Sequence, residues 1–227
     1  MTSFLAFMQD LVAVAFLALG VATAAIWFRR RDRSSGLLAL AIILLSLEVA
    51  FSRMTQLLHI TSPVLSVVNL LAFIGSGYAL FSYRASIIPL SRKWRVGAAS
   101  VLGAAVVAYV VATALSARPT VLLWIALGLL AAWAVVVLEP IIRFFLVARG
   151  LPAVQAWRLR SLSLGFAGLV AIIAFLLALV AAGTKKIDPA VTAGIEVVVL
   201  AIVPLLYVSF APPAWLRREW RASEEEG

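Results

Sequence analysis

The chain lacks cysteine altogether and has a single histidine, His59, among its 227 residues. Without thiols it cannot form disulfides, thiolate metal sites, or cysteine-linked lipid or haem attachments. One imidazole cannot supply a histidine-rich metal site. We therefore expect a protein with no bound metal and no cofactor.

Charge is also scarce, since Asp, Glu, Lys and Arg make up 13% of the residues and hydrophobic residues make up 64%. A soluble domain has about 25% charged and about 45–50% apolar residues. The apolar share corresponds to about 145 residues, which is enough for seven spans of about 20 residues each. The remainder is too small for a soluble domain of about 50 residues. The composition predicts a chain embedded in a lipid bilayer.

The apolar residues fall into seven long runs separated by short polar or Gly/Pro-containing loops. None shows the short alternation of a membrane β-strand. We predict an all-α, seven-helix polytopic membrane domain over residues 1–210, followed by a juxtamembrane tail over 211–227. The predicted helices cover about 4–28, 36–54, 63–83, 96–115, 119–147, 162–182 and 189–210. Gly75 and Gly77 in the third run and the Ala-rich fourth run are typical of close helix packing.

Basic residues are divided unequally between the two sets of helix ends. Because cytoplasmic loops are enriched in Lys and Arg, the split predicts an amino terminus outside and a carboxyl terminus in the cytoplasm of a bacterial plasma membrane. The net charge of +9 is thus a signal of topology, and we expect no nucleic-acid partner. One set of ends holds 15 basic residues (Arg29, Arg30, Arg31, Arg33, Arg84, Arg92, Lys93, Arg95, Arg143, Arg149, Arg158, Arg160, Arg217, Arg218, Arg221) and the other holds 4 (Arg53, Arg118, Lys185, Lys186).

Polar residues inside the spans form the first candidate site. An ionisable side chain in the hydrocarbon core costs about 2.5–3.5 kcal/mol on insertion scales, so each is a functional candidate. In the predicted orientation the candidates lie at similar depth in the outer half of helices 1, 2, 3 and 7, where they could line a ligand or signal pocket. Alternatively, they are headgroup-level or paired structural residues. The candidates are Asp10, Glu48, Arg53, Asn69 and Glu196.

A second candidate site lies in the fifth run. Arg143 follows Glu139 by four positions, which favours an ion pair on one helix face. Pro140 frees a backbone carbonyl one turn earlier, so the same segment is also a candidate hinge.

Catalytic motifs are missing from the sequence. It has no Gly-rich phosphate loop, no paired metal-ligand motif and no Ser/His/Asp set on the predicted cytoplasmic face. The last span has no lysine that could form a retinal Schiff base. We expect that the chain is not an enzyme by itself.

Four segments carry a family resemblance: residues 76–84 (SGYALFSYR) with 88–90 (IPL), residues 138–144 around Leu-Glu-Pro, residues 152–162 (PAVQAWRLRSL) and residues 210–218 (FAPPAWLRR). Together they resemble the seven-helix, amino-terminal membrane region of bacterial sensor histidine kinases and related sensor phosphatases.

The resemblance implies a sensory input module of a two-component system, which relays an outside or membrane signal through helix 7 to a cytoplasmic output. No phosphoacceptor or ATP-binding region follows Arg221, so a kinase or phosphatase output domain would be fused downstream or be a separate chain. The tail from Ala214 reads as the start of a linker helix or as an interfacial anchor. A second copy of the chain is another candidate partner.

Two other functions remain alternatives to sensing. A small transporter or proton-linked carrier would use Glu48 and Glu196 as protonatable groups within the membrane. A packing subunit of a larger membrane complex would need neither residue for chemistry.

Overall fold

The computed structural model describes residues 2–60, 62–184 and 187–225, and within these ranges every regular element is a helix, with no strand. Seven of the helices are long and apolar enough to cross a membrane, which confirms the predicted seven-helix, all-α class. Lys185 and Lys186, used in the charge count, lie outside the described residues. The elements are α1 (Thr2–Arg30), α2 (Arg33–Leu57), α3 (Pro63–Ile87), α4 (Arg92–Ala114), α5 (Pro119–Val147), the 3-10 turn η1 (Ala148–Gly150), α6 (Ala153–Ala181), α7 (Pro189–Phe210) and α8 (Ala214–Glu225).

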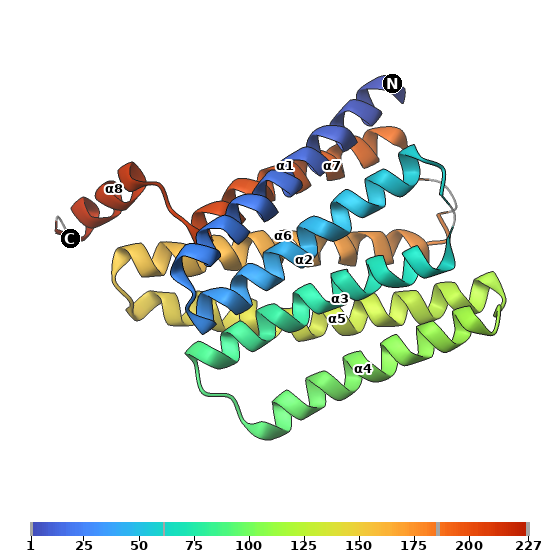
Figure 1. Cartoon of the computed structure of the whole chain (residues 1–227), viewed down its shortest axis with the longest axis horizontal. Helices are drawn as coiled ribbons and strands as arrows, with labels where there is room; N and C mark the ends of the chain where they lie inside the picture. The colour runs from blue at the N-terminus through green and yellow to red at the C-terminus, as the bar shows by residue number, and fades with distance from the viewer. Residues whose placement is uncertain (1, 61, 185–186, 226–227) are drawn as a thin grey trace.

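Successive long helices run in opposite directions, so each end of the bundle collects alternate helix termini (Figure 1). We use "basic end" for the end that holds the first residues of α2, α4 and α6 and the last residues of α1, α3, α5 and α7. The N-terminus of the chain lies at the opposite end (Figure 1). The short helix α8 follows α7 beyond the basic end and packs on α6.

Four helices (α1, α2, α4 and α6) begin earlier than their hydropathy predicted, α6 by the most. α6 begins at Ala153, whereas the apolar run begins at Leu162. The nine residues between are mostly good helix formers, and they extend the helix beyond its apolar part because a helix does not end where hydrophobicity ends. α4 begins at Arg92, where the Ser91 hydroxyl caps the backbone N–H of Trp94.

The helices pack mainly on their sequence neighbours, and α7 returns to pack on α1 and α2 as well as on α6. α4 lies at one edge of the bundle, where it packs chiefly on α5 and meets α3 at few places (Figure 1). The prediction of close packing along the Ala-rich α4 is wrong at its glycines, because Gly97 and Gly103 have open space around them. An edge helix in a bilayer can contact lipid there instead of protein.

The centre of the bundle is built around Trp133 of α5, whose side chain is fully buried. Its indole stacks on Phe73 of α3, with ring centroids 4.4 Å apart, and its Nε1 donates to the Phe73 carbonyl at 3.1 Å. The indole lies directly against Gly77, where any Cβ atom would overlap the ring. Close packing was predicted for Gly77, and here it is what admits a buried tryptophan between α3 and α5.

Gly77→Ala is expected to lower the free energy of unfolding by about 1–3 kcal/mol, because overpacking a filled core displaces its neighbours. Gly103→Ala is the matched control, since nothing lies within 4 Å of its added Cβ. Thermal unfolding in detergent, followed by circular dichroism, checks the difference. Equal stability of the two variants would contradict the packing account.

The turn between α1 and α2 is only two residues long. Arg31 follows the last residue of α1 with a positive φ of 52°, and Asp32 then caps α2. The Asp32 carboxylate accepts the backbone N–H of Ser35 at 2.8 Å. The backbone and side-chain hydrogen bonds from Ser35 lower the pKa of Asp32 from its usual value, because they favour the charged form.

The stability that Asp32 contributes is expected to depend on pH. A lowered folded-state pKa means that the contribution is present above the unfolded-state pKa and is lost as pH falls through the folded-state value. A helix cap contributes about 1 kcal/mol, and Asn caps as well as Asp without titrating. Asp32→Asn should therefore match the parent chain at pH 7 and become relatively more stable below pH 4. Parallel pH dependences in thermal unfolding would contradict this.

Candidate functional site

Arg53, in the last turns of α2, is the best-connected polar side chain at the end opposite the basic end. Its Nε lies 2.7 Å from the carboxylate of Asp10 on α1. Its Nη1 donates to the side-chain oxygens of Gln9 at 3.0 Å and Gln56 at 3.3 Å, and Nη2 to the Ala6 carbonyl at 3.4 Å. The guanidinium, 14% exposed, thus fastens α1 to α2 while its charge remains neutralised.

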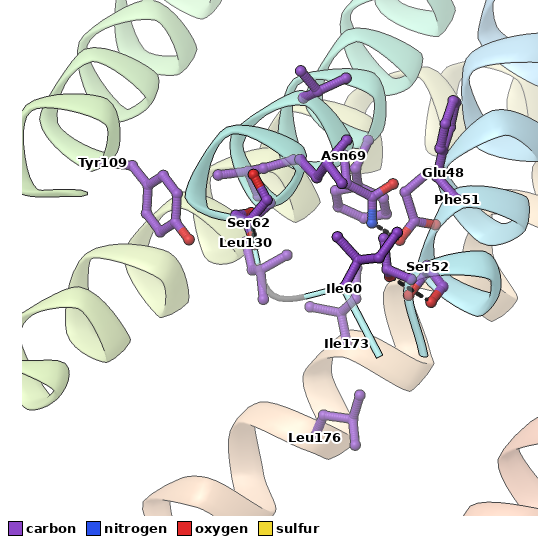
Figure 2. A pocket seen from close by; sticks show the side chains of 16 residues that line it. Glu48, Phe51, Ser52, Ile60, Ser62, Asn69, Tyr109, Leu130, Ile173 and Leu176 are labelled. Carbon is purple, nitrogen blue, oxygen red and sulfur yellow. Dashed lines mark hydrogen bonds between the residues drawn. The ribbon is translucent and has the colours of Figure 1, made fainter. Parts of the chain in front are cut away.

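Glu48 lies on α2 one to two turns deeper in the bundle than Arg53. Its Oε1 accepts the side-chain N–H of Asn69 on α3 at 3.5 Å, and the two side chains turn toward one another (Figure 2). The Oδ1 atom of Asn69 is buried and has no hydrogen-bond partner among the described residues. A buried acceptor without a donor is uncommon in folded proteins and often marks a place for water or a ligand.

A cavity of about 460 Å³ adjoins this pair. It extends from the α2–α3 loop, at Ile60 and Ser62, to apolar side chains of α5 and α6 such as Leu130 and Ile173 (Figure 2). The volume is within the range of small-molecule sites, about 300–1,000 Å³. Its described lining offers carboxylate, amide and hydroxyl groups and no basic side chain. Such a lining suits a guest that donates hydrogen bonds and carries an apolar body.

A smaller cavity of about 200 Å³ lies on the other side of Glu48, among α1, α2 and α7. Gln9, Arg53 and Glu196 of α7 contribute to its polar lining. Glu48 and Ser52, four residues apart on α2, line both cavities. One helix face therefore separates the two spaces.

The structure brings the five predicted pocket residues into one region, where four of them line two cavities. Glu48, Arg53 and Glu196 line the smaller cavity, and Glu48 and Asn69 line the larger one. Asp10 lines neither of these two; it holds Arg53 and borders an apolar groove between α1 and α2. Its side chain is 50% exposed, so its position fits a positioning role better than contact with a guest.

Sequence reasoning missed two members of this region, Gln9 and Gln56, both of which accept from Arg53. Gln56 follows Arg53 by three positions, a spacing that places two side chains on one helix face. That spacing was an available signal for Gln56. Gln9 had a weaker signal, as a polar neighbour of Asp10 in an apolar run.

A second ion-pair site lies toward the basic end. Glu139 and Arg143 do approach each other on α5, at 3.6 Å, but the shorter contact of Glu139 is to Arg84 of α3 at 2.8 Å. Arg84 is 3% exposed, compared with 59% for Arg143. The predicted intrahelical pair is therefore the outer part of a link between two helices. The spacing rule for one helix could not find Arg84, which is 55 positions earlier.

The same guanidinium also caps the end of α3. Nη1 of Arg84 donates to the carbonyl of Ile88 at 3.0 Å and to that of Pro89 at 3.4 Å. The carbonyl groups at the end of a helix have no hydrogen-bond partners within the helix. A buried donor at this position therefore stabilises the conformation of the chain where it leaves α3. α5 runs without interruption through Pro140, which is buried.

The end of α7 is held by α6 and α1. Nε of Arg158 on α6 donates to the Ser209 carbonyl at 3.0 Å, and Nη2 to that of Phe210 at 3.3 Å. The Arg30 guanidinium lies 6.0 Å from the centre of the Phe210 ring. Beyond the break at Pro212 and Pro213, Trp220 of α8 stacks on Trp157 of α6 at 6.1 Å.

Comparisons of the chain with protein-family models, with curated proteins and with solved structures found no match. No group of three or more metal-ligating side chains occurs in the described part of the chain. The candidate sites are therefore defined by their geometry alone.

Arg84→Gln is expected to lower the free energy of unfolding by about 3–5 kcal/mol, because it leaves the Glu139 carboxylate without its buried partner. Arg143→Gln removes the same charge from an exposed position and should cost at most about 1 kcal/mol. Thermal unfolding of both variants in the same detergent makes the comparison. A larger loss for Arg143→Gln would show that the intrahelical pair is the main one.

Proposed function

We propose that the chain is a sensory input module of a bacterial plasma membrane, with its amino terminus outside and its basic end in the cytoplasm. The observation that carries the proposal is the position of Glu48 between two cavities, the smaller of which is also lined by Glu196 of α7. The 15-to-4 distribution of basic residues supports the orientation. In this orientation both cavities lie in the outer half of the membrane.

α7 is the element best placed to carry a signal across the membrane. It holds Glu196 beside the smaller cavity and ends at Phe210 at the basic end, 14 residues later, which is about 21 Å along a helix. Pro204 interrupts its hydrogen bonding between these two points. α7 packs on α1, α2 and α6 rather than on α5, which makes Pro204 a better-placed hinge than Pro140.

The output would pass through the exit of α7 to α8. Arg158 links α6 to the last turn of α7 by hydrogen bonds, and the stacked rings of Trp157 and Trp220 hold α8 against α6. A guest that favours one arrangement of α2 and α7 would therefore move α8 together with the α6–α7 pair. A kinase or phosphatase domain, fused or separate, would read this movement, and a second copy of the chain could supply the partner across a homodimer.

The coupling can be tested without knowledge of the signal. Because the chain has no cysteine, Lys93→Cys with Glu219→Cys gives a unique pair for spin labels on two exposed positions, one on α4 and one on α8. We expect Glu48→Gln and Glu196→Gln each to change the distance distribution between the labels in nanodiscs, because each replaces a carboxyl group in the wall of a cavity with an amide. Asp188→Asn is the control, since it makes the same replacement at an exposed cap of α7 outside the two cavities.

Unchanged distances in both glutamate variants would refute the proposed coupling. Proton flux in proteoliposomes tests the carrier alternative, which requires that Glu48 and Glu196 exchange protons with both sides. The sensory proposal predicts no flux above that of empty vesicles. Flux that disappears in Glu48→Gln would establish the carrier.

A further inference from the structure

A cavity of about 620 Å³ lies at the basic end among α2, α3 and α4, far along the bundle from Glu48. It occupies the part of the structure where α3 and α4 meet at few places. Two arginines, three serines and a tyrosine contribute its polar lining, and Leu37, Phe81 and Ala85 contribute its apolar lining. The polar residues are Arg33, Ser34, Tyr78, Ser82, Ser86 and Arg95.

The two arginines give the cavity uncompensated positive charge. Within the described ranges, neither the Arg33 nor the Arg95 guanidinium forms an ion pair or a hydrogen bond. The nearest acid in sequence, Asp32, is engaged with the backbone N–H of Ser35. Both arginines lie in the first turn of a helix whose first turn contains no acidic residue. At α4, which is capped by the neutral Ser91, the positive end of the helix dipole adds to the charge of Arg95, so this position favours an anion.

Hydroxyl groups line the side of the cavity formed by α3. Tyr78, Ser82 and Ser86 follow one another at intervals of four and therefore share one face of the helix. The Ser86 hydroxyl donates to the Tyr83 carbonyl at 2.7 Å, so Ser34 must be the donor in its 3.2 Å contact with Ser86. That contact joins the start of α2 to the end of α3. Ser82 and Tyr78 line the cavity on the same face of α3.

The position of the cavity selects among anions. Its two arginines stand at the first residues of the apolar spans of α2 and α4, which is the level of the lipid headgroups. Of its apolar side chains, Leu37 lies one turn deeper than Arg33 along α2, and Phe81 and Ala85 lie on α3. The apolar lining would not contribute to the binding of a soluble anion, whereas it would pack against the acyl chains of a lipid.

We propose that this cavity binds the headgroup of an anionic phospholipid. Arg33 and Arg95 hold the phosphate from two helices with charge-assisted hydrogen bonds, and the Ser82 hydroxyl donates to a second oxygen of the headgroup. The acyl chains follow the space between α3 and α4 into the bilayer. The lipid thereby fills the gap left by the weak contact between these two helices. This site does not depend on the sensory proposal, since it involves neither Glu48 nor α7.

The test is titration of phosphatidylglycerol, and of phosphatidylcholine for comparison, into the purified chain in an uncharged detergent, with bound lipid counted by native mass spectrometry. We expect a saturable phosphatidylglycerol site and no saturable phosphatidylcholine site. Arg33→Gln/Arg95→Gln should weaken it roughly 25-fold, about fivefold for each arginine near an anionic headgroup. The matched control is Arg92→Gln/Lys93→Gln, which removes the same charge from the same end of α4 outside the cavity and should bind as the parent does.

Equal losses in the two double variants would overturn the proposal in favour of general surface attraction. Displacement of the lipid by millimolar inorganic phosphate would also overturn it, because the site would then recognise a free anion. Circular dichroism and size-exclusion profiles verify that the variants fold. If Arg33→Gln/Arg95→Gln does not fold, the single variants replace it; a loss of about fivefold in each supports the site, and no loss in either overturns it.

Discussion

The hydrocarbon core of a bilayer offers no water to a polar group, and this constraint shapes almost every specific contact in the bundle. Backbone groups satisfy it by forming helices. Polar side chains satisfy it by meeting partners on other helices: Arg53 reaches α1, Glu48 reaches α3 and Arg158 reaches the end of α7. The contacts that neutralise charge are therefore also the contacts that determine which helices are neighbours.

The two ends of the bundle meet this constraint in different ways. Toward the basic end, Arg84 donates to the carbonyls where its own helix α3 ends, and Arg158 donates to those where α7 ends. At the opposite end, the polar side chains border open cavities, and Asn69 keeps an acceptor without a donor. The first arrangement holds helix ends in place. The second leaves the contacts between α2, α3 and α7 open to change by whatever enters.

Hydropathy was sufficient to predict the seven spans. Exposing polar groups to lipid is costly, so each segment that crosses the membrane must be a long apolar run, and such runs are visible in the sequence. It was poor at the start of α6, where polar helix formers extend the helix beyond the membrane. Depth along the spans brought Glu48, Asn69 and Glu196 to one level, which was enough to nominate them. It could not reveal that two cavities divide them, because depth carries no information about rotation around the bundle axis. The Arg84–Glu139 pair was beyond reach for the same reason, since only packing decides which faces of α3 and α5 meet.

The position of Glu48 on a wall shared by two cavities has a thermodynamic consequence. Glu48 borders both cavities while its Oε1 accepts from Asn69, so a guest that draws the carboxylate into one cavity withdraws it from the other. A guest that binds Glu48 in one cavity lowers the affinity of the other cavity for its guest. The effect is the same in both directions, because such coupling is reciprocal. Two small occupants, even two water clusters, would therefore compete for one carboxylate without ever touching. Binding in one cavity would therefore reduce binding in the other, and the two cavities would not fill independently.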